Sequence, residues 1–300
     1  MMNSIIEVKN LRKYYGNIKA VDDITFSVKK GEIFSLLGPN GAGKTTTLEI
    51  IEGLRKKDEG EIIYFGKFNS PEDFYIKERI GVQLQNSAFM DNLTVYETLK
   101  MFSGLYKKSY DVDKLVSKMS LIEKKNSKVK ELSGGQKQRL AIAVALVNDP
   151  EIVFLDEPTT GLDPQARHII WDLIIELKKL GKTIILTTHY MEEAEYLSDS
   201  IHIIDRGKII AKGTVEELIK SLKRKSIIIF QTENPDIFKK IFDGIIIDNR
   251  VEISSDDLEK TLFNIIDFSK KNNIPIDNIT IRKPNLEDVF LSLTGHSLRE

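Results

Sequence analysis

The residues with the clearest chemical potential form the glycine-rich run Gly38-Pro39-Asn40-Gly41-Ala42-Gly43-Lys44-Thr45. The run follows the apolar segment Ile33–Leu37 and precedes a segment of helical pattern that starts at Thr46. Glycines let the backbone curl until successive N–H groups face one point, and a helix N-terminus adds its positive dipole end there. Such a concavity suits a polyphosphate. We expect Lys44 to reach its β and γ phosphates and the Thr45 hydroxyl to bind Mg²⁺.

A second candidate site follows the apolar run Ile152–Leu155, where the carboxylates of Asp156 and Glu157 come directly after a predicted strand. Ligands of open α/β sheets bind at the carboxyl ends of strands, so we expect Asp156 to hold Mg²⁺ directly or through water. Glu157 points elsewhere and is expected to polarise a water molecule at the γ phosphate. Alone, an Asp-Glu pair is typical of a solvated turn, but the glycine-rich run upstream favours the metal site.

Both sites belong to a predicted α/β domain. From residue 31 to about 205, short apolar runs alternate with segments of helical periodicity, which is the order expected of a parallel sheet covered by helices. β-rich runs at Ile5–Val8 and Ala20–Val28 precede this region. Residues 92–148 form an insert of helical pattern that predicts a helical subdomain. The predicted strands of the main sheet are Ile33–Leu37, Ile80–Leu84, Ile152–Leu155, Thr183–Thr187 and Ile201–Ile204.

A second, smaller domain is predicted after a lysine-rich linker at residues 221–226. Residues 1–222 then form the main domain and residues 226–300 an accessory α+β domain. The pattern of the second domain is compatible with a small split α/β sandwich. Its predicted elements are strand 227–231, helix 235–242, strands 244–247 and 251–253, helix 257–271, strand 276–281 and helix 286–293.

Composition excludes several classes of protein. The 300 residues are 41% hydrophobic and 30% charged, as in folded globular proteins rather than disordered ones. The 44 Lys and Arg residues against 45 Asp and Glu leave a net charge of -1, so no chain-wide basic field favours nucleic acid. The absence of cysteine excludes disulfides, thiolate metal sites and a cysteine nucleophile. The sequence begins without a secretory signal pattern, and its apolar runs are too short for a membrane helix, so we expect the chain to stay where it is made.

The run Leu132-Ser133-Gly134-Gly135-Gln136 discriminates among phosphate-binding proteins. It opens a predicted helix, and alone it reads as a helix N-terminus with Ser133 as the cap. Together with the other motifs, it closely resembles the signature of the ATP-binding cassette (ABC) ATPases, the nucleotide-binding subunits of ABC transporters. The resemblance covers residues 5 to about 220. It implies a P-loop cassette with a parallel core sheet, an antiparallel β subdomain and a helical subdomain, and it implies an enzyme that hydrolyses ATP with Mg²⁺.

The resemblance also implies roles for further residues. Tyr15, with Tyr14 as the alternative, is the aromatic residue that stacks on adenine. Gln85 contacts Mg²⁺ and the attacking water; it follows Leu84 where the family commonly has proline, and Gln83 lies nearby. His189 is the switch histidine, and Asp163 of the run Gly161-Leu162-Asp163 contacts the site of the opposite subunit. The implied nucleotide-binding residues beyond the glycine-rich run are Thr46, Ser133, Gly134, Gly135, Gln136 and Asp163.

In the family, Ser133 and Gly135 of one cassette would close over ATP held by Lys44 of another. The sequence has one copy of each motif, so a complete site needs a second cassette, most simply a second copy of the chain. The tail, Pro284 to Gly295, resembles the extension of bacterial ATPases that pair with ABC-2 type export permeases. We therefore expect an exporter subunit at the cytoplasmic face of a bacterial membrane, without nucleic acid as partner. The alternatives are a soluble ABC ATPase of translation or DNA repair, and an importer ATPase.

Overall fold

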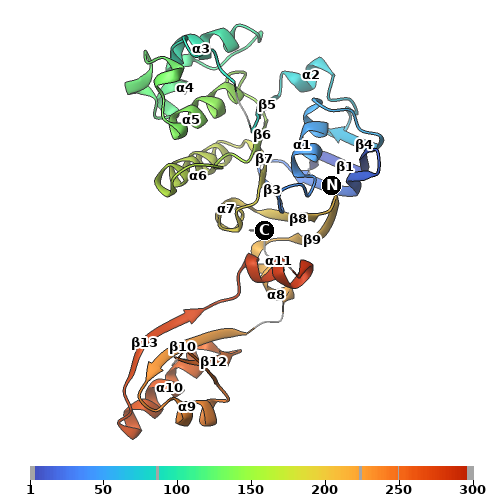
Figure 1. The fold of residues 1–300 in the computed structure, drawn as a ribbon. Helices are drawn as coiled ribbons and strands as arrows, with labels where there is room; N and C mark the ends of the chain where they lie inside the picture. Colours follow the sequence, from blue (N-terminus) through green and yellow to red (C-terminus); the bar gives the residue numbers. More distant parts are fainter. Residues whose placement is uncertain (1–3, 86–87, 223–224, 249, 296–300) are drawn as a thin grey trace. The chain divides into compact units, whose positions relative to one another are not determined.

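The computed structural model of the protein describes residues 4–85, 88–222, 225–248 and 250–295 (Figure 1). The chain divides into two compact units, residues 4–215 and 216–295, and each is described by itself. The predicted linker at 221–226 includes residues 223–224, which lie outside the described residues. The division falls a few residues earlier, because helix α8 (Val215–Ser221) groups almost entirely with the second unit.

A six-stranded sheet forms the centre of the first unit. Its strands are parallel except for the last, which runs antiparallel to its neighbour. The three central strands are buried along their whole length, which explains why they read as continuous apolar runs rather than alternating ones. The order is β5 (Ile80–Gln83), β6 (Ile152–Asp156), β7 (Thr183–Thr188), β3 (Ile33–Leu37), β8 (Ser200–Asp205) and β9 (Lys208–Gly213). The predicted parallel α/β core is confirmed, with the unpredicted β9 added at one edge.

Helices cover the sheet and begin at the carboxyl ends of its strands (Figure 1). Helix α1 (Lys44–Glu52) follows β3 and packs against β6 and β7. Helix α6 (Pro164–Lys179) follows β6, and helix α7 (Met191–Leu197) follows β7. Every segment that carries a predicted catalytic residue therefore meets the same edge of the sheet, because parallel strands end together.

A second sheet is antiparallel, with the order β2 (Ile18–Lys29), β1 (Ser4–Tyr15) and β4 (Glu59–Tyr64). The buried residues of β2 alternate with exposed ones, so one face packs inward. Their core is continuous with the helix α1 side of the main sheet. The short helix α2 (Phe74–Lys77) leads from this sheet to β5.

The segment from residue 92 to 148 contains helices and the loops that join them. It contains α3 (Val95–Ser103), α4 (Val112–Lys118), two 3₁₀ turns (Ile122–Lys124 and Val129–Glu131) and α5 (Gly134–Ala145). Thr94 and Glu97 form a capping box that starts α3. The apolar faces of these helices share one buried cluster with α6 and with residues of the main sheet, and α5 packs directly against β5 and β6.

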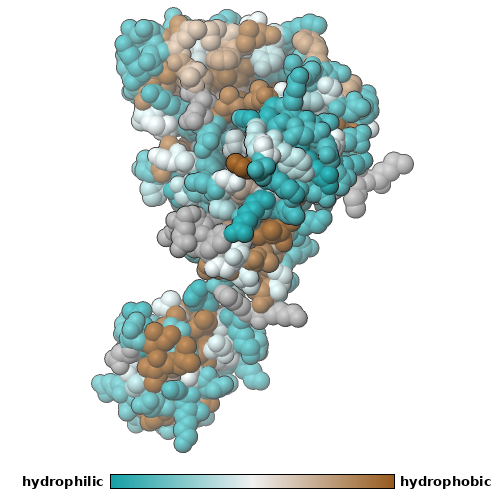
Figure 2. Space-filling view, turned by 45° about the vertical axis from the view of Figure 1, so that its right-hand side comes forward, coloured by the Kyte–Doolittle hydropathy of each residue, from teal (hydrophilic) through white to brown (hydrophobic). Residues whose placement is uncertain are grey.

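The second unit contains the predicted elements. They are β10 (Ser226–Thr232), α9 (Pro235–Phe242), β11 (Ile245–Ile247), β12 (Arg250–Ser255), α10 (Leu258–Asn272), β13 (Ile276–Arg282) and α11 (Leu286–Thr294). The sheet order β11-β12-β10-β13, antiparallel throughout, is that of a split β-α-β fold. A core that includes Phe230 and Phe238 joins sheet and helices. Apolar residues, coloured brown, also gather on the surface of this unit that Figure 2 shows. In the described part of the chain, no helix is long and apolar enough to cross a membrane.

Candidate active site

The glycine-rich run forms a tight loop between β3 and α1. Gly43 has φ 103°, and a Cβ atom on it would lie 2.2 Å from the Ala20 carbonyl oxygen, so only glycine fits. Inside the loop, Lys44 Nζ donates to the carbonyl oxygens of Gly38 at 2.9 Å and Pro39 at 3.1 Å. Because Gly43 caps α1 without a side chain, the N–H groups of the first helical turn are left for a ligand.

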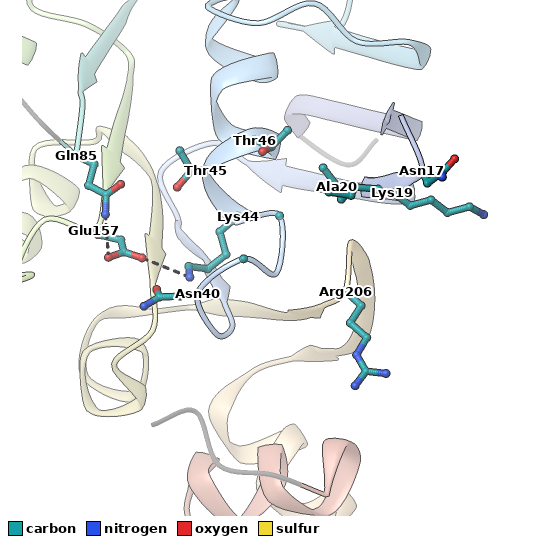
Figure 3. Close-up of a pocket in the computed structure, with 13 residues that line it drawn as sticks. Asn17, Lys19, Ala20, Asn40, Lys44, Thr45, Thr46, Gln85, Glu157 and Arg206 are labelled. Carbon is teal, nitrogen blue, oxygen red and sulfur yellow. Dashed lines mark hydrogen bonds and ion pairs between the residues drawn. The ribbon is translucent and has the colours of Figure 1, made fainter. Parts of the chain in front are cut away.

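A cavity of about 580 Å³ opens beside this loop (Figure 3). The sequence predicts eight of its lining residues. The other five are one residue of the turn between β1 and β2, the first three residues of β2 and one residue of the turn between β8 and β9. No motif marks them, because tertiary packing alone brings these segments to the loop. The lining residues are Asn17, Ile18, Lys19, Ala20, Asn40, Gly41, Gly43, Lys44, Thr45, Thr46, Gln85, Glu157 and Arg206.

Asp156 ends β6 next to the first turn of α1. Its Oδ1 accepts hydrogen bonds from the Thr45 hydroxyl at 3.3 Å and from the Thr187 hydroxyl. Burial raises the pKa of Asp156, and the two hydroxyl bonds oppose this rise. Residues 4–85, 88–222, 225–248 and 250–295 contain no cluster of three or more His, Asp or Glu that could hold a metal by itself. A single carboxylate beside a hydroxyl can nevertheless supply the protein ligands of a Mg²⁺ ion whose other ligands come from phosphates and water.

Glu157 is the centre of the site (Figure 3). Its Oε1 lies 3.3 Å from Lys44 Nζ. Its Oε2 accepts from the Thr160 hydroxyl at 3.0 Å and from Gln85 Nε2 at 3.4 Å. Although burial acts to raise the pKa of Glu157, His189 and Lys44 outweigh it and lower the pKa to about 2. The carboxylate is therefore ionised at neutral pH and held among polar groups from four separate segments of the chain.

The structure brings Gln85 and His189 to Glu157. His189 follows β7, and its Nδ1 lies 3.2 Å from Glu157 Oε2, although this contact lacks hydrogen-bond geometry. Of the two neighbouring glutamines, Gln83 is buried and donates to the Leu84 carbonyl oxygen at 2.6 Å. Gln85 lines the cavity. Gln83 reaches only the main-chain oxygen of Asp156, at 3.5 Å, whereas Gln85 contacts the side-chain carboxylate of Glu157.

Tyr15 does not line the cavity. Its hydroxyl accepts a hydrogen bond from Arg55 Nη1 at 2.6 Å, and Lys13 Nζ lies 5.5 Å from its ring centroid. Ile18, the first residue of β2, lines the cavity and is 68% exposed. Stacking of adenine on Tyr15 therefore stays a prediction that this arrangement does not test.

The residues predicted to act across a dimer cap helices away from the cavity. The Ser133 hydroxyl accepts from Gln136 N at 3.4 Å, and Gln136 Oε1 accepts from Ser133 N at 2.9 Å, so the two form a capping box on α5. Asp163 caps α6 by accepting from Ala166 N at 2.8 Å. The helix-cap interpretation of Ser133 is correct, and its predicted phosphate contact, like those of Gly134 and Gly135, stays untested.

A glycine-rich loop that opens α1, with a strand-end aspartate bonded to its threonine, defines a P-loop nucleoside triphosphatase. A sequence model described as ABC transporter matches residues 21–160. Two relatives match almost the whole chain. The Nod factor export ATP-binding protein I of Burkholderia orbicola is 40% identical over 98% of both chains. The linearmycin resistance ATP-binding protein LnrL of Bacillus subtilis is 35% identical over 99% of this chain and 100% of its own. The chain belongs to the ATP-binding proteins of ABC transporters and is an ATPase of that family.

Solved cassettes share the fold of the first unit. One is the cbiO1 protein of Clostridium perfringens, part of the ABC transporter complex cbiONQ, with 29% identity and a TM-score of 0.64 over 74% of this chain and 95% of that one. Another is a dimeric cassette in a post-hydrolysis state bound to ADP and Pi, with 29% identity and a TM-score of 0.63 over 70% of this chain and 98% of that one. The expected cassette fold is confirmed.

Proposed function

We propose that the chain is the ATP-hydrolysing subunit of an exporter and drives a separate ABC-2 type permease at the cytoplasmic face of a bacterial membrane. The observation that carries this proposal is the length of chain over which the exporter relatives align with it. The relatives named for Nod factor export and linearmycin resistance align over 98% and 99% of this chain, so the alignment includes the second unit as well as the cassette. A likeness confined to the cassette would fit an importer equally well.

In the proposed hydrolysis, Lys44 holds the β and γ phosphates while Glu157 orients the attacking water and accepts its proton. Lys44 Nζ lies 3.3 Å from Glu157 Oε1 and helps to keep the pKa of Glu157 low. Transfer of Lys44 to the phosphates weakens this attraction, so the pKa of Glu157 rises toward the range of a useful base when ATP binds. Gln85 and Thr160 donate to the other carboxylate oxygen and hold it in place, and His189 lies next to it. Water adds to the γ phosphorus and ADP leaves.

The residues present fit a magnesium ion. Thr45 Oγ1 and Asp156 Oδ1 lie 3.3 Å apart at the mouth of the phosphate loop, and both are the oxygen ligands that Mg²⁺ prefers. Thr45, Asp156 and the side-chain oxygen of Gln85 would hold the ion. When bound, it would neutralise charge on the β and γ phosphates.

The proposed working unit is a head-to-tail pair of chains. Ser133 and Gly135 lie exposed or half-buried at the N-terminus of α5 and are not part of the cavity that contains Lys44. A helix N-terminus attracts phosphate, so α5 of a second copy is suited to cover an ATP held by Lys44. ATP then bridges the two chains, and hydrolysis releases them.

Mixing two inactive variants tests this sharing. Lys44→Ala destroys the phosphate loop, whereas Ser133→Asp keeps a good helix cap but sets a negative charge against phosphate. Each variant alone is expected to lack ATPase activity. Random pairing puts half of all dimers in the mixed form, each with one intact site, so an equimolar mixture should recover about a quarter of the wild-type rate. A mixture no more active than its two components would contradict the head-to-tail pair.

The permease is proposed to dock on the first unit beside Gln85. Phe74 in α2, Met90 and Leu105 are 59%, 61% and 74% exposed and are among the most exposed large apolar side chains of the described residues. Lys107 Nζ lies 5.0 Å from the Phe74 ring centroid, so α2 and the segment that follows α3 lie close together. A membrane partner docked on this apolar surface would contact the segment that carries Gln85, so that ATP binding and hydrolysis could move the partner.

Co-purification tests the function most directly. The chain, tagged and extracted in mild detergent from its own cell, is expected to bring down a polytopic membrane protein. A Phe74→Ser/Leu105→Ser variant should lose this partner while keeping its ATP affinity, because neither residue lines the cavity. Recovery of ribosomes or DNA with no membrane protein would support the soluble alternative, and recovery of an importer permease would overturn export.

A further inference from the structure

A buried carboxylate outside the cavity links the two loops that carry Glu157 and His189. Glu193 lies in α7, four residues after His189, and is completely buried. Its Oε1 accepts hydrogen bonds from the Thr159 hydroxyl at 2.7 Å and from Trp171 Nε1 at 3.0 Å. Thr159 follows Glu157 by two residues, and Trp171 lies in α6. One side chain therefore joins the segment after β6, helix α6 and the segment after β7.

The surroundings of Glu193 require a hydrogen-bond acceptor. Burial raises its pKa, and hydrogen bonds from Thr188, Thr159 and Trp171, together with the charge of Arg167, oppose the rise. Among the described residues, its Oε2 has no partner of good hydrogen-bond geometry. Burying such a group costs more than burying an apolar side chain of the same size. A cost of this kind adds little stability, but the two bonds to Oε1 tie the segment after β6 and helix α6 to α7.

We infer that Glu193 is a positioning residue for ATP hydrolysis, which fixes the loop after β6, with Glu157, against the loop after β7, with His189. The inference rests on the proposed roles of Glu157 and His189. The contact it protects is short, with 3.2 Å between His189 Nδ1 and Glu157 Oε2. The same bond also helps to position Asp163 at the far end of the loop, because Thr159 lies between Glu157 and Asp163 and is held by Glu193.

Glu193→Met tests the inference, because methionine fills a similar volume without an acceptor. It is expected to lower kcat at least about 10-fold while the KM for ATP changes less than about twofold, since misplacement of reacting groups costs rate and Lys44 still holds the phosphates. Glu193→Gln keeps one acceptor oxygen and should retain most of kcat. An unchanged kcat in folded Glu193→Met, or an equal loss in Glu193→Gln, would overturn the inference.

Thr159→Val provides a second test if Glu193→Met does not fold. It removes one donor and should lower kcat about fivefold at constant KM. Added to Glu193→Met, it should cause no further loss, because both changes break the same bond. Additive losses would refute the network.

The fluorescence of Trp171 gives an independent readout, because the sequence has one tryptophan. Its emission should shift in Glu193→Met, which removes the acceptor of the indole N–H, but not in Thr159→Val. Glu157→Gln is assayed alongside. Full activity in that variant rejects the proposed site, whereas loss of activity there with normal activity in Glu193→Met rejects only the role of Glu193.

Discussion

Glu157→Gln is expected to bind ATP with affinity similar to that of the wild type and to hydrolyse it at least about 100-fold more slowly. The amide keeps the shape of the side chain and one oxygen, which can face either Lys44 or Thr160. It cannot accept a proton from water, and it presents no negative charge to orient the attacking molecule. Binding should survive, because the loop, Lys44 and Thr45 make the phosphate contacts.

Steady-state phosphate release and equilibrium ATP binding, measured on the same preparation, check this expectation. Glu151→Gln is the matched control, since Glu151 precedes the opposite end of β6 and pairs on the surface with Arg79 at 2.9 Å. It should keep the wild-type rate. A normal rate in Glu157→Gln would remove Glu157 from the catalytic role, and loss of both binding and rate would indicate a structural role instead.

The parts of the site that follow a local pattern could be predicted from the sequence. The glycine-rich loop needs a strand before it, glycines with positive φ and a helix after it, and all three conditions are local. The central strands were equally clear, because strands buried on both faces read as unbroken apolar runs. Strand β9, whose sequence KIIAKG alternates only weakly and whose residues are mostly half-buried, carries too little contrast to be predicted at the edge of the sheet.

Contacts between distant segments could not be predicted. The pairing of Lys44 with Glu157 and the approach of Ile18 and Arg206 to the cavity depend on how turns pack after folding. Glu193 shows the same limit: an acid in the first turn of a helix reads as a favourable charge at a helix N-terminus. Only the structure reveals that its side chain turns inward to Thr159 and Trp171.

Lys44→Ala is expected to reduce ATP binding below detection in calorimetry. Lys44 is 4% exposed, and its ammonium is the buried cation at the base of the phosphate loop. The variant loses charge-assisted bonds to the phosphates, each typically worth about 1.5 to 3 kcal/mol. It also leaves Glu157 without its lysine partner, so an ionised, buried carboxylate then faces the incoming triphosphate.

Repulsion between Glu157 and the triphosphate can be measured separately from the loss of the Lys44 contacts. If repulsion from Glu157 contributes, Lys44→Ala/Glu157→Gln should bind ATP measurably better than Lys44→Ala, although both remain inactive. Lys56→Ala, which removes an exposed lysine just beyond α1, controls for the loss of one positive charge and should bind normally. Equal affinity in the single and double variants would show that Glu157 does not repel the nucleotide. Tight ATP binding by Lys44→Ala would overturn the assignment of the phosphate loop itself, because no other buried cation lines the described cavity.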